Sequence, residues 1–154
     1  MPAPQPTIIS VNISPGGIPK RPIEVGRVTT DGIDGDGHDH QKHITPLQAL
    51  SLLDIEDLDD LRGEGFDVGA GTCGENLTVR GLDADALAVG DRLHLAGGVE
   101  LEISKVRKPC YVLDSISPVL KDAIIGRCGC YAKVITPGEV RPGETIEVKR
   151  QPER

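Results

Sequence analysis

Aromatic side chains make up only 2% of this 154-residue sequence, and tryptophan is absent. Because hydrophobic residues still reach 38%, the core must be built mainly from aliphatic side chains. Basic residues are in the minority, with 17 Lys and Arg against 24 Asp and Glu and a net charge of -7. The scarcity of stacking groups and the lack of a basic face argue against a protein that binds nucleic acid.

Long apolar runs are also missing, so no segment is expected to span a bilayer. The opening residues, MPAPQPTIIS, lack the charged and apolar regions of a signal peptide. We therefore expect a cytoplasmic protein with no membrane partner. In that compartment its four cysteines, at positions 73, 110, 128 and 130, are expected to be thiols rather than disulfides.

Short β-strands are the main element that the sequence predicts. A chain of this length is most simply one domain, spanning residues 1–154, with residues 1–6 as a flexible tail. The 19 Gly and 12 Pro favour many turns, and a hairpin turn is predicted at 96–98. We expect a mainly β fold, a closed β-barrel with one or two short helices, because closure removes exposed edges. Alternating or β-branched residues predict strands at 7–13, 23–30, 92–95, 99–103, 131–135 and 145–148.

Two helices are predicted. The first begins after Thr45, which is suited to cap it, and its leucines up to Leu61 form a mostly apolar stripe. The acidic residues within 54–60 would form its solvated face. The second helix covers 117–124, with Ser117 as its cap.

The stretch "RKPC" places Arg107 and Lys108 immediately before Pro109 and Cys110 in an otherwise acidic chain. Neighbouring cations stabilise a thiolate, the nucleophilic and metal-binding form of cysteine. The proline restrains the backbone, which suits a thiol on a rigid loop at the end of a strand. The alternative is that Cys110 is a small buried hydrophobic residue.

A glycine-rich stretch, "GIDGDGHDHQKH", covers residues 32–43. Asp36, His38 and His40 are its candidate site residues, and the two histidines point the same way if the backbone is extended. These side chains suit either polar contacts to a bound substrate or a metal site. The remaining interpretation is a plain turn, since no cysteine with zinc-type spacing accompanies them.

Two further motifs carry polar or thiol groups. In "GENLTV", Glu75 and Asn76 offer acceptors and donors that can fix a loop or a ligand, just before a strand. In "RCGCYAKV", Arg127 precedes Cys128 and Cys130, which share one face if the segment is a strand. Their spacing is one residue short of the C-x-x-C of zinc ribbons and thioredoxin-like motifs.

Four segments, taken in order, resemble the MOSC domain, the module named after the C-terminal part of molybdenum cofactor sulfurases. The segments are "GIDGDGHDH", "GENLTVRGLD", "VGDRLHLAGGVELEISKVRKPC" and "GRCGCYAKVITPGEVRPGETIEV". The resemblance covers residues 9 to 148 and implies a β-rich, barrel-like fold. It also implies that Cys110 is the key thiol. In related reductases this cysteine ligates the molybdenum of the cofactor, and in sulfurases it is thought to handle sulfur.

The same resemblance implies a set of residues that would contact molybdenum cofactor. Arg107, Lys108 and Arg127 would form a cationic patch around the anionic sulfur and attract the anionic pterin. The expected polar contacts to the cofactor come from Asp36, His38, His40, Glu75 and Asn76. Cys110 would be the metal ligand.

Three functions remain open from the sequence. The first is a small protein that binds molybdenum cofactor, or carries sulfur for it, with sulfur donor or acceptor proteins as partners. The second is a molybdenum-dependent reductase of N-hydroxylated compounds that needs a separate electron-transfer partner, because no flavin, haem or iron–sulfur motif is present. The third is a non-catalytic thiol or zinc module. Whether the chain is an oxidoreductase, a sulfur transferase or no enzyme thus stays open.

Overall fold

A computed structural model describes residues 5–16, 18–37, 48–109 and 111–150. These residues form an eight-stranded mixed sheet, a three-stranded sheet, two short α-helices and two 3-10 turns. The larger sheet contains β1 (Thr7–Ile13), β2 (Arg21–Ile23), β5 (Leu50–Asp54), β6 (Leu77–Arg80), β7 (Arg92–Leu95), β8 (Glu100–Val106), β9 (Cys130–Thr136) and β11 (Ile146–Lys149). The smaller sheet contains β3 (Gly26–Thr29), β4 (Gly32–Ile33) and β10 (Gly138–Val140), and the helices are α1 (Ile55–Gly63), α2 (Leu120–Ala123), η3 (Ala84–Ala86) and η4 (Tyr111–Ser115).

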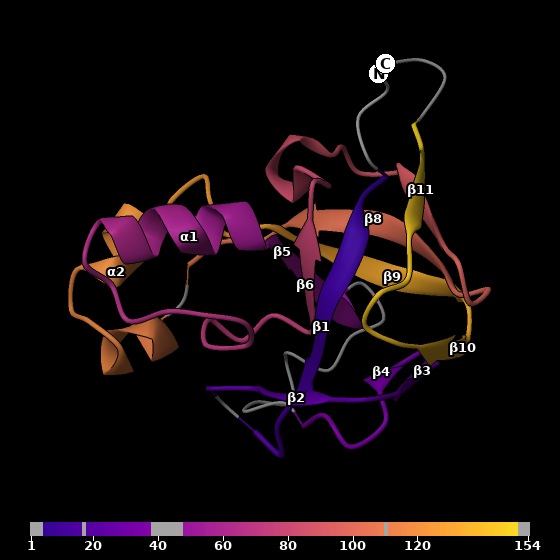
Figure 1. Cartoon of the computed structure of the whole chain (residues 1–154), viewed down its shortest axis with the longest axis horizontal. Helices are drawn as coiled ribbons and strands as arrows, with labels where there is room; N and C mark the ends of the chain where they lie inside the picture. Colours follow the sequence, from indigo (N-terminus) through magenta and orange to yellow (C-terminus); the bar gives the residue numbers. More distant parts are fainter. Residues whose placement is uncertain (1–4, 17, 38–47, 110, 151–154) are drawn as a thin grey trace.

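The larger sheet is open, so the predicted closed barrel is wrong. Its strands lie in the order β11-β7-β8-β9-β5-β6-β1-β2, with β11 and β2 at the two edges (Figure 1). The segment before β11 is fastened to the start of β1 by an isolated bridge between Thr7 and Thr145. Among the described residues this bridge does not extend into a pairing of β1 with β11. Further along β1, residues Val11 to Ile13 pair with β2 instead.

Short, polar edge strands explain how the sheet remains open. The prediction of a barrel assumed that closure protects the edges, but other devices serve the same purpose. The edge strand β2 has three residues, of which Arg21 and Pro22 are exposed. At the other edge, β11 exposes Glu147 and Lys149. Charge, proline and short length all discourage another chain from pairing there.

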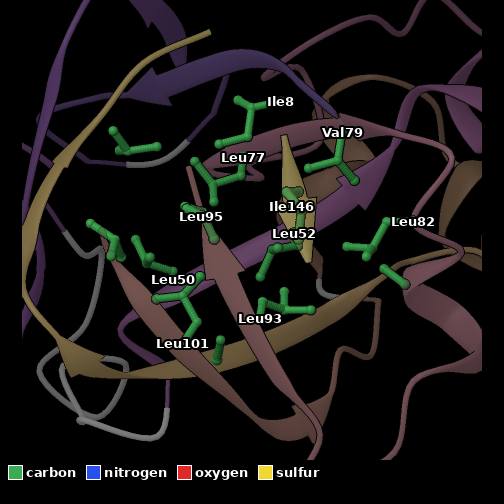
Figure 2. Packing of buried hydrophobic residues seen from close by; sticks show 14 of the residues in the cluster. Ile8, Leu50, Leu52, Leu77, Val79, Leu82, Leu93, Leu95, Leu101 and Ile146 are labelled. Carbon is green, nitrogen blue, oxygen red and sulfur yellow. The ribbon is translucent and has the colours of Figure 1, made fainter. Parts of the chain in front are cut away.

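The main core is aliphatic, as the composition predicts. Figure 2 shows leucine, isoleucine and valine side chains of β1, β5, β6, β7, β8 and β11 packed together on one face of the large sheet. Leu50 and Leu52 from the central strand and Leu101 from β8 are among the side chains with no exposed surface. Burying each such side chain stabilises the fold by about 1.5–3 kcal/mol before conformational entropy is counted.

The first predicted helix is wrong in its N-terminal half. The segment expected to continue the helix from Thr45 is instead the strand β5, and α1 begins only at Ile55. All five residues of β5 are buried, because the strand lies between β9 and β6 and is covered on both faces. A run of leucines that is buried on every side fits a central strand as well as a helix. Thr45 itself lies outside the described residues.

The solvated acidic face predicted for residues 54–60 is wrong at its first member. Asp54 is only 4% exposed, and its carboxylate accepts hydrogen bonds from the backbone N–H groups of Leu82, Asp83 and Ala84. Burial raises the pKa of Asp54, although these three bonds act in the opposite direction. The Asp54 side chain thus connects the end of β5 to the start of η3 by buried hydrogen bonds. Asp57, also predicted on this face, is half-buried, whereas Glu56, Asp59 and Asp60 are exposed, as predicted.

Both helices lie on one side of the molecule, away from the small sheet (Figure 1). They enclose a second aliphatic cluster that contains Leu58 and Leu61 of α1 and Leu120 of α2. The second predicted helix, 117–124, is confirmed in a shorter form, but the prediction that Ser117 caps it is wrong, because α2 begins at Leu120 and Val119 is its N-cap. Ser117 instead accepts a hydrogen bond from the N–H of Val119 at 3.3 Å, before the helix begins. None of the described helices has the length and apolar content that crossing a membrane would require.

Candidate functional site

A cavity of about 590 Å³ opens where the end of β8 meets the segment that follows α2. Its walls come from residues 106–109, 121–122, 125–126 and 128–129, together with Asp85. The volume falls within the range of roughly 300–1,000 Å³ that is usual for small-molecule sites. The predicted "RKPC" stretch therefore leads along one wall of this cavity, and Cys110 itself lies outside the described residues.

Arg107 is the cation that the fold holds most firmly at this site. Its guanidinium donates to the carbonyl oxygen of Cys73 and, at 3.4 Å, to that of Cys128. Its backbone N–H donates to the carbonyl of Gly129 at 3.2 Å. Because both side-chain acceptors are neutral, these contacts orient the guanidinium without cancelling its charge. The cation is thus fixed between two turns, at the wall of the cavity.

The other predicted cations separate into two places. Lys108 is exposed and lines the cavity beside Arg107. Arg127 is not among the described lining residues: its guanidinium forms an ion pair with Glu64 at the end of α1 and donates to the carbonyl of Ala123. The hydrogen bond from Arg127 lowers the pKa of Glu64. Lys121 of α2 lines the cavity instead, a residue that the sequence analysis did not single out.

None of the three described cysteines, Cys73, Cys128 and Cys130, forms a disulfide, and their surroundings differ. Burial raises the pKa of Cys73 and of Cys130 to about 12, so both are protonated at neutral pH. Cys128 lines the cavity, although only 2% of its surface is exposed. Cys73 and Cys128 belong to the cluster beneath the helices, whereas Cys130 belongs to the sheet core. No group of three or more potential metal ligands forms within the described part of the chain.

Asp36 is the centre of a largely buried polar network. One carboxylate oxygen accepts the backbone N–H of Ser14 at 3.0 Å, and the carboxylate forms an ion pair with Lys20 at 2.6 Å. Asn76 donates to the second oxygen at 2.9 Å. The side chain of Asp36 is 2% exposed, so the ion pair is shielded from water. These contacts of Asp36 fix the described part of the glycine-rich stretch to Ser14, Lys20 and Asn76. His38 and His40 lie outside the described residues.

Glu75 and Asn76 extend this network into the sheet. Asn76 accepts the backbone N–H of Ser51 at 3.1 Å. The Glu75 Oε2 atom accepts the N–H of Gly71 at 2.9 Å and the hydroxyl of Thr78 at 2.6 Å. Its other oxygen, Oε1, is buried and has no hydrogen-bond partner among the described residues. Burial raises the pKa of Glu75, which therefore holds its proton to higher pH than an exposed glutamate.

The fold thus brings Asp36, Glu75, Asn76 and Arg107 into one region. Asn76 is hydrogen-bonded to Asp36, and the Glu75 side chain reaches Asn76 through Thr78 and Asn12. Arg107 is attached next to them through the carbonyl of Cys73. Arg107, which lines the cavity, can orient an anionic ligand. The hydrogen bonds of Asp36 and Asn76 can restrain the neighbouring loop. Sequence reasoning missed Lys121 because a lone lysine on a short helix resembles any solvated charge. It also missed Val106 and Ile125, which line the same cavity.

Comparison with protein families gives one clear match. The model of the MOSC domain matches residues 39–147, which is most of the chain and includes both the cavity and the "RKPC" stretch.

Two curated proteins and one solved structure are similar to the chain. A protein named "Reductase" from Gibberella moniliformis is 31% identical over 131 residues, which are 79% of this chain and 23% of that protein. The uncharacterized protein YflK from Bacillus subtilis is 30% identical over 147 residues, 90% of this chain and 65% of YflK. The chain therefore spans less than two thirds of either relative. The crystal structure of the YuaD protein from Bacillus subtilis has a TM-score of 0.81 at 20% identity and covers 96% of this chain and 97% of its own, so that likeness concerns the fold alone.

Proposed function

Since the chain belongs to the MOSC domain family, we propose that it binds molybdenum cofactor, or carries sulfur for it, at Cys110. The observation that carries this proposal is the guanidinium of Arg107. It is anchored on two neutral carbonyl groups three residues before Cys110, so its positive charge remains available to an anionic sulfur or ligand. Lys108 adds a second cation at the cavity wall.

The residues present fit such a cofactor in three respects. The cavity has the volume of a small-molecule site, and cations line it where an anionic pterin would need them. The cysteine that follows Pro109 supplies a thiolate, which is a suitable ligand for a soft metal centre. The cofactor, when bound, supplies a centre for sulfur or electron exchange. The protein's own part is to keep the Cys110 thiol deprotonated and to hold Arg107 in a fixed orientation.

Asp36, Glu75 and Asn76 would act mainly as positioning residues in this proposal. Their hydrogen bonds join the start of the glycine-rich loop to β5 and β6, which are central strands. A loop tied to a rigid sheet can present His38 and His40 to a ligand with little loss of entropy. We also propose that sulfur donor or acceptor proteins are the partners, and that the protein acts in the cytoplasm.

The second candidate function is reduction of N-hydroxylated compounds. The observation in its favour is the 31% identity to the protein named "Reductase", although the chain corresponds to 23% of that protein's length. Such a reaction consumes two electrons per turnover. Because the sequence has no flavin, haem or iron–sulfur motif, these electrons would come from a separate electron-transfer protein.

The test is to express the protein in a host that makes molybdenum cofactor and to measure metal and pterin content. We expect molybdenum and pterin fluorescence in the wild type and their loss in Cys110→Ser, because a hydroxyl is a poor ligand for a soft metal. Cys130→Ala is the matched control, since this thiol is buried in the sheet core and should not affect cofactor content. Equal molybdenum in Cys110→Ser and wild type, or zinc in place of molybdenum, would contradict the proposal.

Sulfur transfer and reduction are separated by a second measurement on the same preparations. Mass spectrometry after incubation with a persulfide donor detects an added sulfur on Cys110 if the protein is a carrier. Turnover of a hydroxylamine with an artificial reduced dye detects the reductase.

A further inference from the structure

Two exposed apolar side chains line the cavity, and the interior of the protein does not account for them. Val106 is 58% exposed and Ile125 is 66% exposed, although large aliphatic side chains are usually buried. They come from different segments, the end of β8 and the chain after α2, yet they line the same cavity. Scattered exposed apolar residues are ordinary, but two that share the walls of a cavity form a surface that a ligand can cover.

Charge in the cavity is opposite in sign to that of the whole protein. Three cations line it, Arg107, Lys108 and Lys121, against the carboxylates of Asp85 and Asp122. Asp85 already accepts the backbone N–H of Gly129 at 2.9 Å. Within the described part of the chain, the side-chain amines of Lys108 and Lys121 form no ion pair or hydrogen bond. In a chain with a net charge of -7, unpaired lysines on a cavity favour an anion as their partner.

We propose that this cavity binds a small organic anion with an apolar body. Lys108 and Lys121 contact its anionic group, and Val106 and Ile125 cover its apolar part. This inference rests on the proposed function for the role of the ligand, which is either the pterin cofactor or a substrate that meets it. The chemistry of recognition is the same for both, and it depends on residues other than Cys110.

A fluorescent probe with this chemistry tests the site directly. Anilinonaphthalene sulfonate carries a sulfonate on an aromatic body, and its emission rises when apolar surface surrounds it. In a titration of the folded wild-type protein we expect saturable binding that weakens with added salt, because a charge contact is screened. Lys108→Gln with Lys121→Gln should weaken binding by about tenfold at low salt and remove most of its salt dependence.

The apolar half of the site has its own variants. Val106→Ser with Ile125→Ser should weaken binding by about tenfold at every salt concentration. The neutral dye phenylnaphthylamine should lose affinity in these serine variants and keep it in the glutamine variants. Matched controls are Val89→Ser, which changes a 62% exposed valine outside the cavity, and Lys149→Gln on β11. Lys121 is half-buried and the other substituted positions are exposed at the surface, and no described ion pair or side-chain hydrogen bond of Lys108 or Lys121 is lost, so thermal unfolding should remain close to that of the wild type.

Clear results would overturn the inference. If the cavity variants bind the sulfonate dye as tightly as wild type, or if Val89→Ser weakens binding equally, the probe does not occupy this cavity. Loss of affinity for the neutral dye in the glutamine variants would remove the assigned role of the lysines.

The source of the ligand is decided by comparing protein from hosts with and without molybdenum cofactor. Dye that binds only the cofactor-free protein identifies the cofactor as the natural occupant. Dye that binds both forms equally well identifies a second ligand, such as a substrate. A protein that binds the dye as described but never acquires molybdenum would contradict the proposed function while leaving the cavity assignment intact.

Discussion

Arg107 donates a hydrogen bond from its guanidinium to the backbone carbonyl of Cys73, which lies 34 positions earlier in the chain. This contact ties the end of β8 to the turn that leads into β6. The turn is tightly packed: a side-chain carbon added at Gly74 would lie 3.2 Å from the same guanidinium. The most firmly held cation of the candidate site is therefore also a structural tie between two parts of the sheet.

Replacing Arg107 with lysine should destabilise the protein by about 1–3 kcal/mol. A lysine keeps the charge but cannot donate to the Cys73 and Cys128 carbonyls together, so one buried acceptor loses its partner. Urea denaturation at neutral pH measures the change in the free energy of unfolding. Lys108→Gln is the control and should change this free energy by less than about 0.5 kcal/mol, since Lys108 is exposed. Equal stability of the Arg107→Lys variant and the wild type would show that the tie contributes little.

Cys110 should react with an alkylating reagent before the other thiols. Burial raises the pKa of Cys73 and of Cys130 to about 12, so their thiolate populations are negligible at pH 7. Brief labelling near neutral pH followed by peptide mass mapping gives the order of reaction. Cys128 is the informative comparison, because it lines the cavity and is almost fully buried. Faster labelling of Cys128 than of Cys110 would contradict this prediction and identify Cys128 as the most reactive thiol.

Asp36→Ala should lower the free energy of unfolding by about 3–5 kcal/mol. The change leaves Lys20 as a poorly solvated cation and removes an acceptor from Asn76 and from the backbone of Ser14. Chemical denaturation measures the loss, and Asp34→Ala nearby is the control because Asp34 is exposed. A loss below about 1 kcal/mol would mean that water replaces the carboxylate easily.

The stability of the protein should fall as the pH rises between about 4 and 8 because of one carboxyl group. Burial, a hydrogen bond to Asp85 and the charge of Asp85 raise the pKa of Asp57 to about 8, from 3.8. A raised carboxyl pKa means that the folded state binds more protons than the unfolded state in this window, so deprotonation disfavours folding. Asp57→Asn should flatten this part of the pH profile, measured as the unfolding midpoint in urea. An unchanged slope would assign the dependence to other groups, such as Glu75.

Most strands were predictable because their residues are β-branched or their apolar residues alternate. The single strand predicted at 23–30 is wrong, because this range is divided between β2 and β3, which belong to different sheets. The ranges 7–13 and 92–95 match β1 and β7, and the turn at 96–98 closes the hairpin between β7 and β8. Such strands have one face on the core and one on solvent, which gives a period of two in the sequence. The strand β5 has no such period because both of its faces are buried. Its leucines therefore resembled a helix until its neighbours in the sheet were known.

Openness of the sheet was not predictable from the strands alone. Which strand lies beside β1 depends on the path of the chain between distant segments, and periodicity does not contain that information. The same holds for the candidate site. The cations before Cys110 are visible in "RKPC", but the partners of Arg107 and the ion pair of Arg127 with Glu64 follow from tertiary packing. Lys121 and Ile125 belong to the cavity only because α2 folds back against the end of β8.

The position of β5 in the sheet affects how the chain can fold during synthesis. This strand pairs with β6 on one side and on the other with β9, which is made much later (Leu50 pairs with Ala132). A ribosome-bound chain that ends before β9 leaves one edge of β5 unpaired, although all five residues of this strand are buried in the folded protein. Such an edge can pair wrongly with another nascent chain. The protein should therefore form its native sheet only near the end of translation. Until β9 emerges from the ribosome, the unpaired edge of β5 is a site that a holding chaperone would protect.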